Sequence, residues 1–324
     1  MKICIIKLGA DGDVLRTLPL ANALKKKHPG AEITWITRGD IATLIDNLPY
    51  IDKVVTIPYS TKEVFDELYN FDTEEAALDL AMSINADKKY GFYADGEFAA
   101  AFNLGAEYYL NTMFDDELKK ENKKTYQEMM FMAAELKYEK ERYELILTEK
   151  DEKYAEKWKE ENNLTNQNII GIHMGAGSRW PSKAWHPDCV KEFIVKAKKK
   201  GYEIILFGGP NEIDKHEQLN KQLEQDRITI YHNNPHNSKR GFAALVSLCD
   251  YVVCSDSLAL HVSLGLGKKT VALFFVTSPD EVEGYGILKK IISPKLKEFF
   301  PERSDVYDAE LTKSISAGEV LEEI

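Results

Sequence analysis

Short runs of aliphatic and β-branched residues alternate with helix-length segments in this chain, and the alternation occurs twice. In the first half the runs lie at residues 3–7, 32–37 and 53–57, with helical patterns between them. Strands joined by crossovers of that length pair in parallel. The first half therefore predicts an α/β fold built on a doubly wound parallel sheet.

The alternation restarts near residue 168 and continues almost to the end of the chain. The second set of predicted strands covers residues 168–173, 203–207, 228–231, 251–255 and 270–275, and helices are predicted at 188–200, 211–225, 241–249 and 258–265. At 324 residues the chain is longer than most single-core domains, because cores tend to divide beyond roughly 250–300 residues. We therefore expect two Rossmann-like doubly wound domains, residues 1–165 and 166–324, whose strand ends face a cleft.

Between the two sets of strands, residues 72–150 carry aromatic and methionine side chains among many charges. The apolar residues that recur there at helical spacing are Tyr126, Met129, Met130, Ala133 and Leu136. This spacing predicts a helix packed on the core, and a flexible apolar lip for an acceptor is the alternative. Residues 150–164 hold many i,i+4 pairs of opposite charge, which predicts a solvated helical connector between the domains.

Two shorter segments carry expectations of their own. Pro19 lies inside the first helical stretch, so we expect a short irregular turn at residues 12–17 before the regular helix begins. Residues 315–324 predict a short closing helix, which could pack back on the N-terminal domain.

Charge and cysteine content restrict the partners and the compartment. The chain has 42 basic and 53 acidic residues, a formal net charge of −11, which disfavours nucleic acid or an anionic membrane as the main partner. Its four cysteines form no C-x-x-C pair, and most lie in or beside apolar runs, as reduced buried thiols do. The N-terminus does not resemble a signal peptide, and no apolar run has the roughly 18–20 residues that a membrane span needs. We expect a soluble, cytoplasmic protein with at most peripheral membrane contact.

Four loops at predicted strand ends carry the residues with chemical potential, and the first is K-L-G-A-D-G-D (Lys7–Asp13). Its glycines either let the backbone approach a ligand closely or simply permit the turn. The pattern is neither G-x-G-x-x-G nor a P-loop, which argues against dinucleotide and P-loop nucleotide binding. Asp13 could act as a general base, or it could cap the following helix.

The second loop is H-M-G-A-G-S-R-W-P-S-K-A-W (His173–Trp185). Small residues, hydroxyls and the cations Arg179 and Lys183 give it a composition suited to a diphosphate, although the cations could be ordinary surface charges. The third loop is F-G-G-P-N-E (Phe207–Glu212). Glu212 could bind ribose hydroxyls, or it could simply favour the first turn of a helix.

The fourth loop is C-S-D-S-L-A-L-H (Cys254–His261). A helix that begins after Ser257 would direct N–H donors and partial positive charge at a phosphate. His261 could donate a hydrogen bond to a leaving group, or it could be a packing residue. No metal site is expected, because His232 and His236 flank an Asn-Asn-Pro sequence that cannot be regular helix.

Together with N-L-P-Y-I-D-K-V (Asn47–Val54), these loops resemble glycosyltransferase family 9, the ADP-heptose:lipopolysaccharide heptosyltransferases and their relatives. The likeness covers most of the chain in the same order and is weaker at about residues 72–165. It implies a GT-B fold with the acceptor bound mainly by the N-terminal domain and the donor by the C-terminal domain. It also implies inverting transfer from a nucleotide-diphosphate sugar, such as ADP-heptose, to a glycan or glycolipid of the cell surface, with no cofactor and no metal on the diphosphate.

The resemblance also implies roles for particular residues. Asp13 falls on the general base of the family, and we expect Gly12 and Arg16 on the acceptor side. The residues expected to bind the donor are Ser178, Arg179, Lys183, Gly209, Glu212, Asp256, Ser257 and His261. Within this set, Ser178 and Lys183 match diphosphate contacts, Glu212 matches a nucleoside-side acid, and the last three match the donor loop.

Some positions depart from the usual family pattern. Leu258 stands where the family has glycine in Asp-Thr-Gly, so a side chain occupies space where donor and backbone would approach closely. Arg16 replaces a common histidine and could favour an anionic acceptor, and Gly9-Ala10-Asp11 replaces Ser-Ser-hydrophobe. A nucleotide-sugar epimerase of similar architecture and an inactive nucleotide-sugar-binding homologue are the alternative functions.

Overall fold

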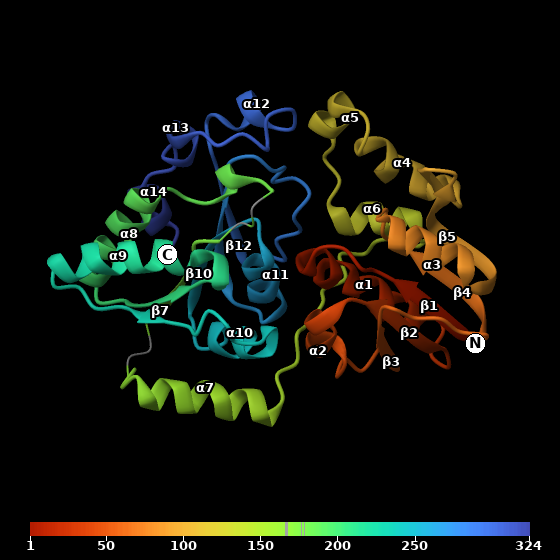
Figure 1. Cartoon of the computed structure of the whole chain (residues 1–324), viewed down its shortest axis with the longest axis horizontal. Helices are drawn as coiled ribbons and strands as arrows, with labels where there is room; N and C mark the ends of the chain where they lie inside the picture. Colours follow the sequence, from red (N-terminus) through yellow and green to blue (C-terminus); the bar gives the residue numbers. More distant parts are fainter. Residues whose placement is uncertain (166–167, 176, 178) are drawn as a thin grey trace. The chain divides into compact units, whose positions relative to one another are not determined.

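The computed structural model describes residues 1–165, 168–175, 177 and 179–324. It divides into two compact units, Met1–Ile146 with Asp280–Glu283, and Leu147–Pro279 with Gly284–Ile324 (Figure 1). Each unit contains one six-stranded sheet, as the two sets of predicted strands indicated. The units divide at Leu147, about one helix before the boundary at residue 165 that the sequence suggested.

The sheet of the first unit has the strand order β3-β2-β1-β4-β5-β6. Its strands are β1 (Lys2–Ile6), β2 (Glu32–Thr37), β3 (Lys53–Thr56), β4 (Val64–Asn70), β5 (Asn85–Asp95) and β6 (Phe98–Ala101). All neighbours pair in parallel except β5 and β6. The chain winds from β1 outward through β2 and β3, then returns to place β4 on the other side of β1. The strand order therefore reverses between β1 and β4.

The helices of the first unit are α1 (Asp11–Lys27), α2 (Ala42–Ile45), α3 (Glu75–Ser83), α4 (Leu104–Thr112), α5 (Asp116–Glu121) and α6 (Tyr126–Ala133). The predicted helix at Tyr126 is confirmed as α6, and it is a core helix: Tyr126, Met129, Met130 and Ala133 are all buried. Leu136, the last residue of the predicted spacing, lies beyond its end. The alternative of a flexible apolar lip does not apply to the buried side chains.

The irregular turn expected at residues 12–17 is wrong, because α1 is continuous and contains Pro19 in its interior. A proline inside a helix costs about 3 kcal/mol through its missing N–H and its clash with the preceding turn. The buried face of α1 includes Leu15, Leu18 and Leu24. Full burial of each such side chain contributes about 1.5–3 kcal/mol, so packing outweighs the cost of the proline.

The sheet of the second unit is entirely parallel, with the strand order β12-β11-β10-β7-β8-β9. Its strands are β7 (Ile169–His173), β8 (Glu203–Phe207), β9 (Tyr231–His232), β10 (Tyr251–Ser255), β11 (Lys269–Phe274) and β12 (Leu288–Ile292). β7, β8, β10 and β11 were predicted, β9 begins three residues after the start of the predicted strand at 228–231, and β12 was not predicted. Here the strand order reverses between β7 and β10.

The helices of the second unit are α7 (Glu149–Glu161), α8 (Pro187–Lys199), α9 (Ile213–Gln225), α10 (Lys239–Val246), α11 (Leu258–Gly265), α12 (Leu296–Phe299), α13 (Ala309–Thr312) and α14 (Ala317–Glu322). The closing helix α14, which the sequence left free to pack on the N-terminal domain, packs on α8 instead. None of the described helices is both long and apolar enough to cross a bilayer.

The charged helix α7 is docked on the second unit rather than only solvated. Both Asp151 carboxylate oxygens accept hydrogen bonds from Arg240 Nε of α10, at 3.1 and 3.0 Å. Burial alone would raise the pKa of Asp151, but the hydrogen bonds from Arg240 and Thr148 lower it to about 2. The ring of Trp158 also meets Tyr231 edge-on. These contacts explain why α7 belongs to the second unit.

Candidate functional site

Most of the predicted site residues lie at the two points where strand order reverses, and Gly209 and Glu212 follow the neighbouring strand β8. In open α/β sheets, ligands bind beyond the carboxyl ends of the strands at such points. In the first unit the loops after β1 and β4 meet there, and the β1 loop leads directly into Asp13. In the second unit the loops after β7 and β10 meet, and they carry Lys183 and Asp256.

Asp13 lies in the first turn of α1, next to Gly12 and half-exposed. Its carboxylate Oδ1 is 2.9 Å from Nη2 of Arg16, with 30% of the Asp13 side chain exposed and 13% of the Arg16 side chain. The N-cap position belongs to Ala10, whose side chain makes no capping hydrogen bond. Asp13 is therefore not the N-cap residue of α1, and its carboxylate lies beside a cation at the surface of the unit.

Arg16 is fixed by an aromatic ring of α6. Its guanidinium carbon lies 3.8 Å from the centroid of the Tyr126 ring, a close cation–π contact. The Tyr126 hydroxyl is in turn 3.2 Å from Oγ1 of Thr17. Because Tyr126 is fully buried, α6 determines where the guanidinium next to Asp13 can lie.

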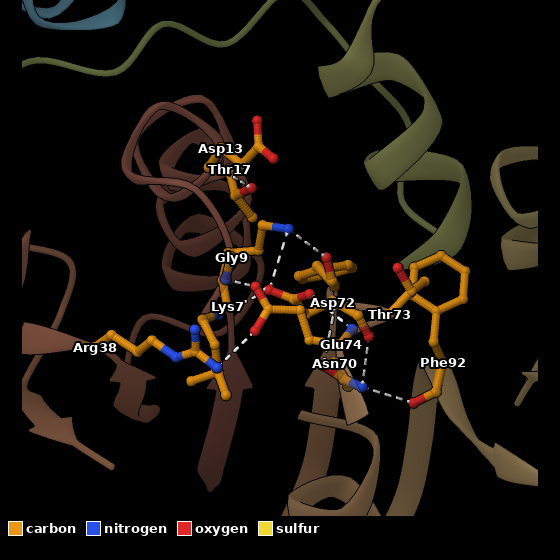
Figure 2. Close-up of polar contacts among 12 residues, drawn as sticks. Lys7, Gly9, Asp13, Thr17, Arg38, Asn70, Asp72, Thr73, Glu74 and Phe92 are labelled. Carbon is orange, nitrogen blue, oxygen red and sulfur yellow. Dashed lines mark hydrogen bonds and ion pairs between the residues drawn. The ribbon is translucent and has the colours of Figure 1, made fainter. Parts of the chain in front are cut away.

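A buried lysine and a buried aspartate follow the ends of β1 and β4, near the start of α1 (Figure 2). Nζ of Lys7 donates to the Phe71 carbonyl at 3.0 Å and lies 3.4 Å from Oδ2 of Asp72. Burial favours the neutral amine, but Tyr126, Asp72 and Asp13 outweigh it, so the pKa of Lys7 lies above its usual value. Lys7 is therefore a charged ammonium held inside the first unit.

Sequence reasoning missed Asp72, because no motif marks it and β4 was not predicted. Only the pairing of β1 with β4 brings residue 72 next to residue 7. The same loop carries Glu74, whose carboxylate is 2.6 Å from Nη2 of Arg38 at the end of β2. The carboxyl ends of three strands thus contribute charged side chains around the start of α1 (Figure 2).

Lys183 is the buried cation of the second unit. It ends the short 3₁₀ segment Pro181–Lys183, is 8% exposed, and its Nζ lies 3.3 Å from Oδ2 of Asp256 and 4.8 Å from the centroid of the Trp180 ring. Burial argues against an ordinary surface charge. Arg179 is exposed and its guanidinium carbon lies 5.0 Å from the same ring. Ser178, also expected to bind the donor, lies outside the described residues.

The N-terminus of α11 adjoins this lysine through Asp256. Oδ1 of Asp256 is 3.8 Å from Nε2 of His261, which is 4% exposed. Ser257 occupies the N-cap position, yet its side chain makes no capping bond, and its buried Oγ has no hydrogen-bond partner among the described residues. A buried hydroxyl without a partner at a helix N-terminus suits an anionic ligand that accepts its proton.

Glu212 and Gly209 form one tight turn at the end of β8. The Gly209 N–H donates to Oε2 of Glu212 at 2.8 Å, so the carboxylate does support its own turn. A Cβ at Gly175 would lie only 2.8 Å from Cδ of Glu212. Glycine at 175 is therefore required by space, and it brings the loop after β7 against the half-buried Glu212 carboxylate.

Three histidines near Glu212 form a neutral cluster that was not predicted. The rings of His216 and His232 are 5.9 Å apart, and His173 lies at the end of β7. Burial, followed by the neighbouring His232 and His173, lowers the pKa of His216 to about 4. Nδ1 of His173 and Nε2 of His216 are buried without hydrogen-bond partners among the described residues. His236, in contrast to these three histidines, is exposed.

No group of three or more His, Cys, Asp or Glu side chains within the described ranges is arranged to hold a metal ion. The cluster of His173, His216 and His232 can instead offer hydrogen-bond donors or acceptors according to the tautomer of each ring.

Comparison with known proteins identifies one family. A sequence model described as glycosyltransferase family 9 (heptosyltransferase) matches residues 75–305. The chain is 23% identical over 313 residues to lipopolysaccharide core heptosyltransferase OpsX of Haemophilus influenzae, an alignment that covers 90% of this chain and 84% of that protein.

Solved structures of similar fold include a glycosyl transferase of family 9 and a heptosyltransferase. A glycosyl transferase of family 9 from Veillonella parvula has a TM-score of 0.78 and 18% identity, covering 99% of this chain and 95% of that one. The E. coli heptosyltransferase WaaC, solved with ADP, has a TM-score of 0.65 and 16% identity, covering 99% and 98%. These likenesses confirm the predicted GT-B class of fold, with two Rossmann-like sheets.

Proposed function

The chain belongs to glycosyltransferase family 9, and from that premise we propose that it transfers heptose from ADP-heptose to a lipopolysaccharide-type glycolipid with inversion. The observation that carries the proposal is the buried Lys183 beside the N-terminus of α11, where the hydroxyl of Ser257 lacks a partner. That arrangement suits a diphosphate leaving group. OpsX and WaaC, which the chain resembles, are heptosyltransferases, and WaaC was solved with ADP.

On the donor side, the second unit stabilises the departing ADP. As the bond between the anomeric carbon and the diphosphate oxygen breaks, its electron pair leaves with the diphosphate. Lys183, the Ser257 hydroxyl and the backbone N–H groups of α11 oppose the charge that develops there. The Glu212 carboxylate accepts hydrogen bonds from the ribose hydroxyls. Because protein groups supply this positive charge, the proposed reaction needs no metal on the diphosphate.

On the acceptor side, the first unit activates the nucleophile. Asp13 removes the proton of the acceptor hydroxyl as that oxygen attacks the anomeric carbon from the face opposite the diphosphate, which inverts the configuration. A positioned base contributes about 10²–10⁴-fold in rate. The Arg16 guanidinium orients the Asp13 carboxylate, and it favours an acceptor with an anionic group.

The proposal places the reaction in the cytoplasm, with the acceptor as the only link to a membrane. All four cysteines are free thiols, as in proteins of reducing compartments.

The decisive experiment incubates the protein with ADP-heptose and a heptose-free lipopolysaccharide acceptor, with and without EDTA. We expect ADP release and a mass increase of one heptose on the acceptor, both dependent on the acceptor and insensitive to EDTA. Consumption of ADP-heptose at the same rate without acceptor would overturn the transferase proposal. Absence of ADP binding in a thermal-shift assay would overturn the choice of nucleotide.

A further inference from the structure

Asp72 makes more backbone contacts than an ion pair with Lys7 requires (Figure 2). Its Oδ2 accepts hydrogen bonds from the backbone N–H of Leu8, at 2.9 Å, and of Gly9. Its Oδ1 accepts from the N–H of Glu74 at 3.1 Å. One buried carboxylate therefore ties the loop after β1 to the loop after β4.

The Asp72 loop is itself held rigidly by Asn70, which is fully buried at the end of β4. The Asn70 side-chain amide donates to the carbonyls of Asp72, at 3.0 Å, and of Phe92, at 2.8 Å. Its Oδ1 accepts from the Asp72 N–H at 3.1 Å. Asn70 thus links the backbone of Asp72 to Phe92 of β5 by hydrogen bonds.

Gly9 is required by the closeness of this carboxylate. A Cβ at residue 9 would lie 2.8 Å from Oδ2 of Asp72, closer than real Cβ contacts. The φ of Gly9 is not positive, so the need is for space rather than for a left-handed backbone. Of the two readings of the glycines in this loop, close backbone approach applies to Gly9, and the approaching group is Asp72.

The position of the loop after β1 determines where the first turn of α1, which contains Asp13, begins. Ala10 follows Gly9 and is the N-cap residue of α1. Its carbonyl accepts from the N–H of Asp13, at 2.7 Å, and of Val14, at 3.1 Å. The first turn of α1 therefore begins from an anchor that Asp72 holds.

We propose that Asp72 is a positioning residue for Asp13: by fixing Leu8 and Gly9, it sets where the first turn of α1 places the Asp13 carboxylate. The inference rests on the proposed function, in which Asp13 is the base. Misplacing a catalytic group by about 1 Å can cost about 10²-fold in rate. The effect falls on the chemical step, since the donor residues lie in the other unit.

Two variants test the hydrogen bonds between Asp72 and the loop after β1, and each variant changes one of the two partners. Asp72→Asn keeps the size of the side chain but removes its charge and one acceptor oxygen. Gly9→Ala leaves Lys7 and Asp72 in place and pushes the loop away from the carboxylate. Gly30→Ala is the matched control, because Gly30 follows α1, has no positive φ, and has nothing within 4 Å of an added Cβ.

For Asp72→Asn and Gly9→Ala we expect kcat with ADP-heptose to fall about 10–10²-fold, while the KM for the donor and the thermal stabilisation by ADP stay unchanged. The double variant should lose no more than the worse single variant, because both break one contact. Amide hydrogen exchange should accelerate at Leu8, Gly9 and Asp13 in both variants and stay unchanged in Gly30→Ala.

A Gly9→Ala protein with wild-type kcat and wild-type exchange at these amides would overturn the inference. Losses of kcat that merely follow the global free energy of unfolding, with no local change in exchange, would overturn it as well. If the wild-type protein does not transfer heptose, the proposed function fails, but the exchange data still decide whether Asp72 holds this loop. The two failures are therefore distinguishable.

Discussion

Each unit of this protein holds a buried lysine next to an aspartate at the point where its strand order reverses. In the first unit Nζ of Lys7 is 3.4 Å from Oδ2 of Asp72, and in the second Nζ of Lys183 is 3.3 Å from Oδ2 of Asp256. The two pairs differ in what surrounds them. Backbone N–H groups donate to both carboxylate oxygens of Asp72, and Lys7 donates to a backbone carbonyl.

Around Lys183 the neighbours are side chains and a helix end. His261 lies 3.8 Å from Asp256, and the adjacent Ser257 hydroxyl has no partner in the described part of the chain. The comparison teaches that an ion pair saturated by backbone holds a loop in shape, whereas a pair beside an unsatisfied donor is suited to bind a ligand. We therefore assign a structural role to the pair of Lys7 and Asp72, and donor binding to the pair of Lys183 and Asp256.

The largest expected effect concerns Asp13, whose position depends on the pair of Lys7 and Asp72. Asp13→Asn removes the proposed base and should lower kcat by about 10²–10⁴-fold. Stabilisation by ADP should persist, and at about 100 times its Kd it should remain near 2.7 kcal/mol. Steady-state kinetics and thermal shift on the same preparation measure both. Normal transfer by Asp13→Asn would refute the assignment of the base and leave the family membership untouched.

Lys7→Met tests the architectural pair. Removing one partner of a buried ion pair costs about 3–5 kcal/mol, because the remaining charge is left uncompensated. We expect the free energy of unfolding in urea to fall by about that amount, with ADP stabilisation of the folded protein retained. A variant that folds as stably as the wild type, but no longer binds ADP, would reverse the roles assigned to the two pairs.

Lys183→Met tests the ligand-binding pair with the same substitution. Loss of a charged hydrogen bond to the diphosphate should weaken ADP binding by about 1.5–3 kcal/mol. The free energy of unfolding should change less than in Lys7→Met, because Asp256 is more exposed than Asp72. Isothermal titration calorimetry with ADP measures the first quantity and urea denaturation the second. Equal destabilisation by the two substitutions would remove the distinction between the pairs.

The smallest expected effect is a difference in acid sensitivity between the units. The pKa of His216 is lowered from 6.5 to about 4 in the folded second unit, so protonation favours unfolding. Its stabilising contribution is present above pH 6.5 and is lost as the pH falls towards 4. The first unit contains only one histidine, His28.

Hydrogen exchange at pH 7 and pH 5 should therefore show the larger loss of protection in the second unit. His216→Gln should flatten this pH dependence. An unchanged pH dependence in His216→Gln would mean that another group controls it.

Much of the fold could be predicted because buried parallel strands are continuous apolar runs. β2, β8 and β10 were predicted with their observed bounds, and the central strand β1 differs by one residue at each end. Strands with charged or exposed positions were missed. β4 contains Asp66 and Glu67, and β12 lies at the sheet edge with Lys289 and Lys290 exposed, so neither has a continuous apolar run.

The candidate site was predictable only in part, for a similar reason. Asp13, Lys183 and Ser257 lie in the segments that directly follow predicted strands, so their positions could be inferred from local order along the chain. Asp72 follows a strand that was missed. Tyr126 was predicted to pack in the core, but nothing in the spacing of α6 indicates that its ring supports Arg16.

By itself the sequence determined the two α/β units and the loops that carry the proposed chemistry, because apolar periodicity and loop composition are local properties. Tertiary structure alone decided which charges meet: Lys7 and Asp72 are 65 positions apart, and Lys183 and Asp256 are 73 apart. In both cases the contact exists because two strands distant in the sequence lie side by side in parallel. That pairing depends on the order in which the whole sheet is assembled, which no local pattern specifies.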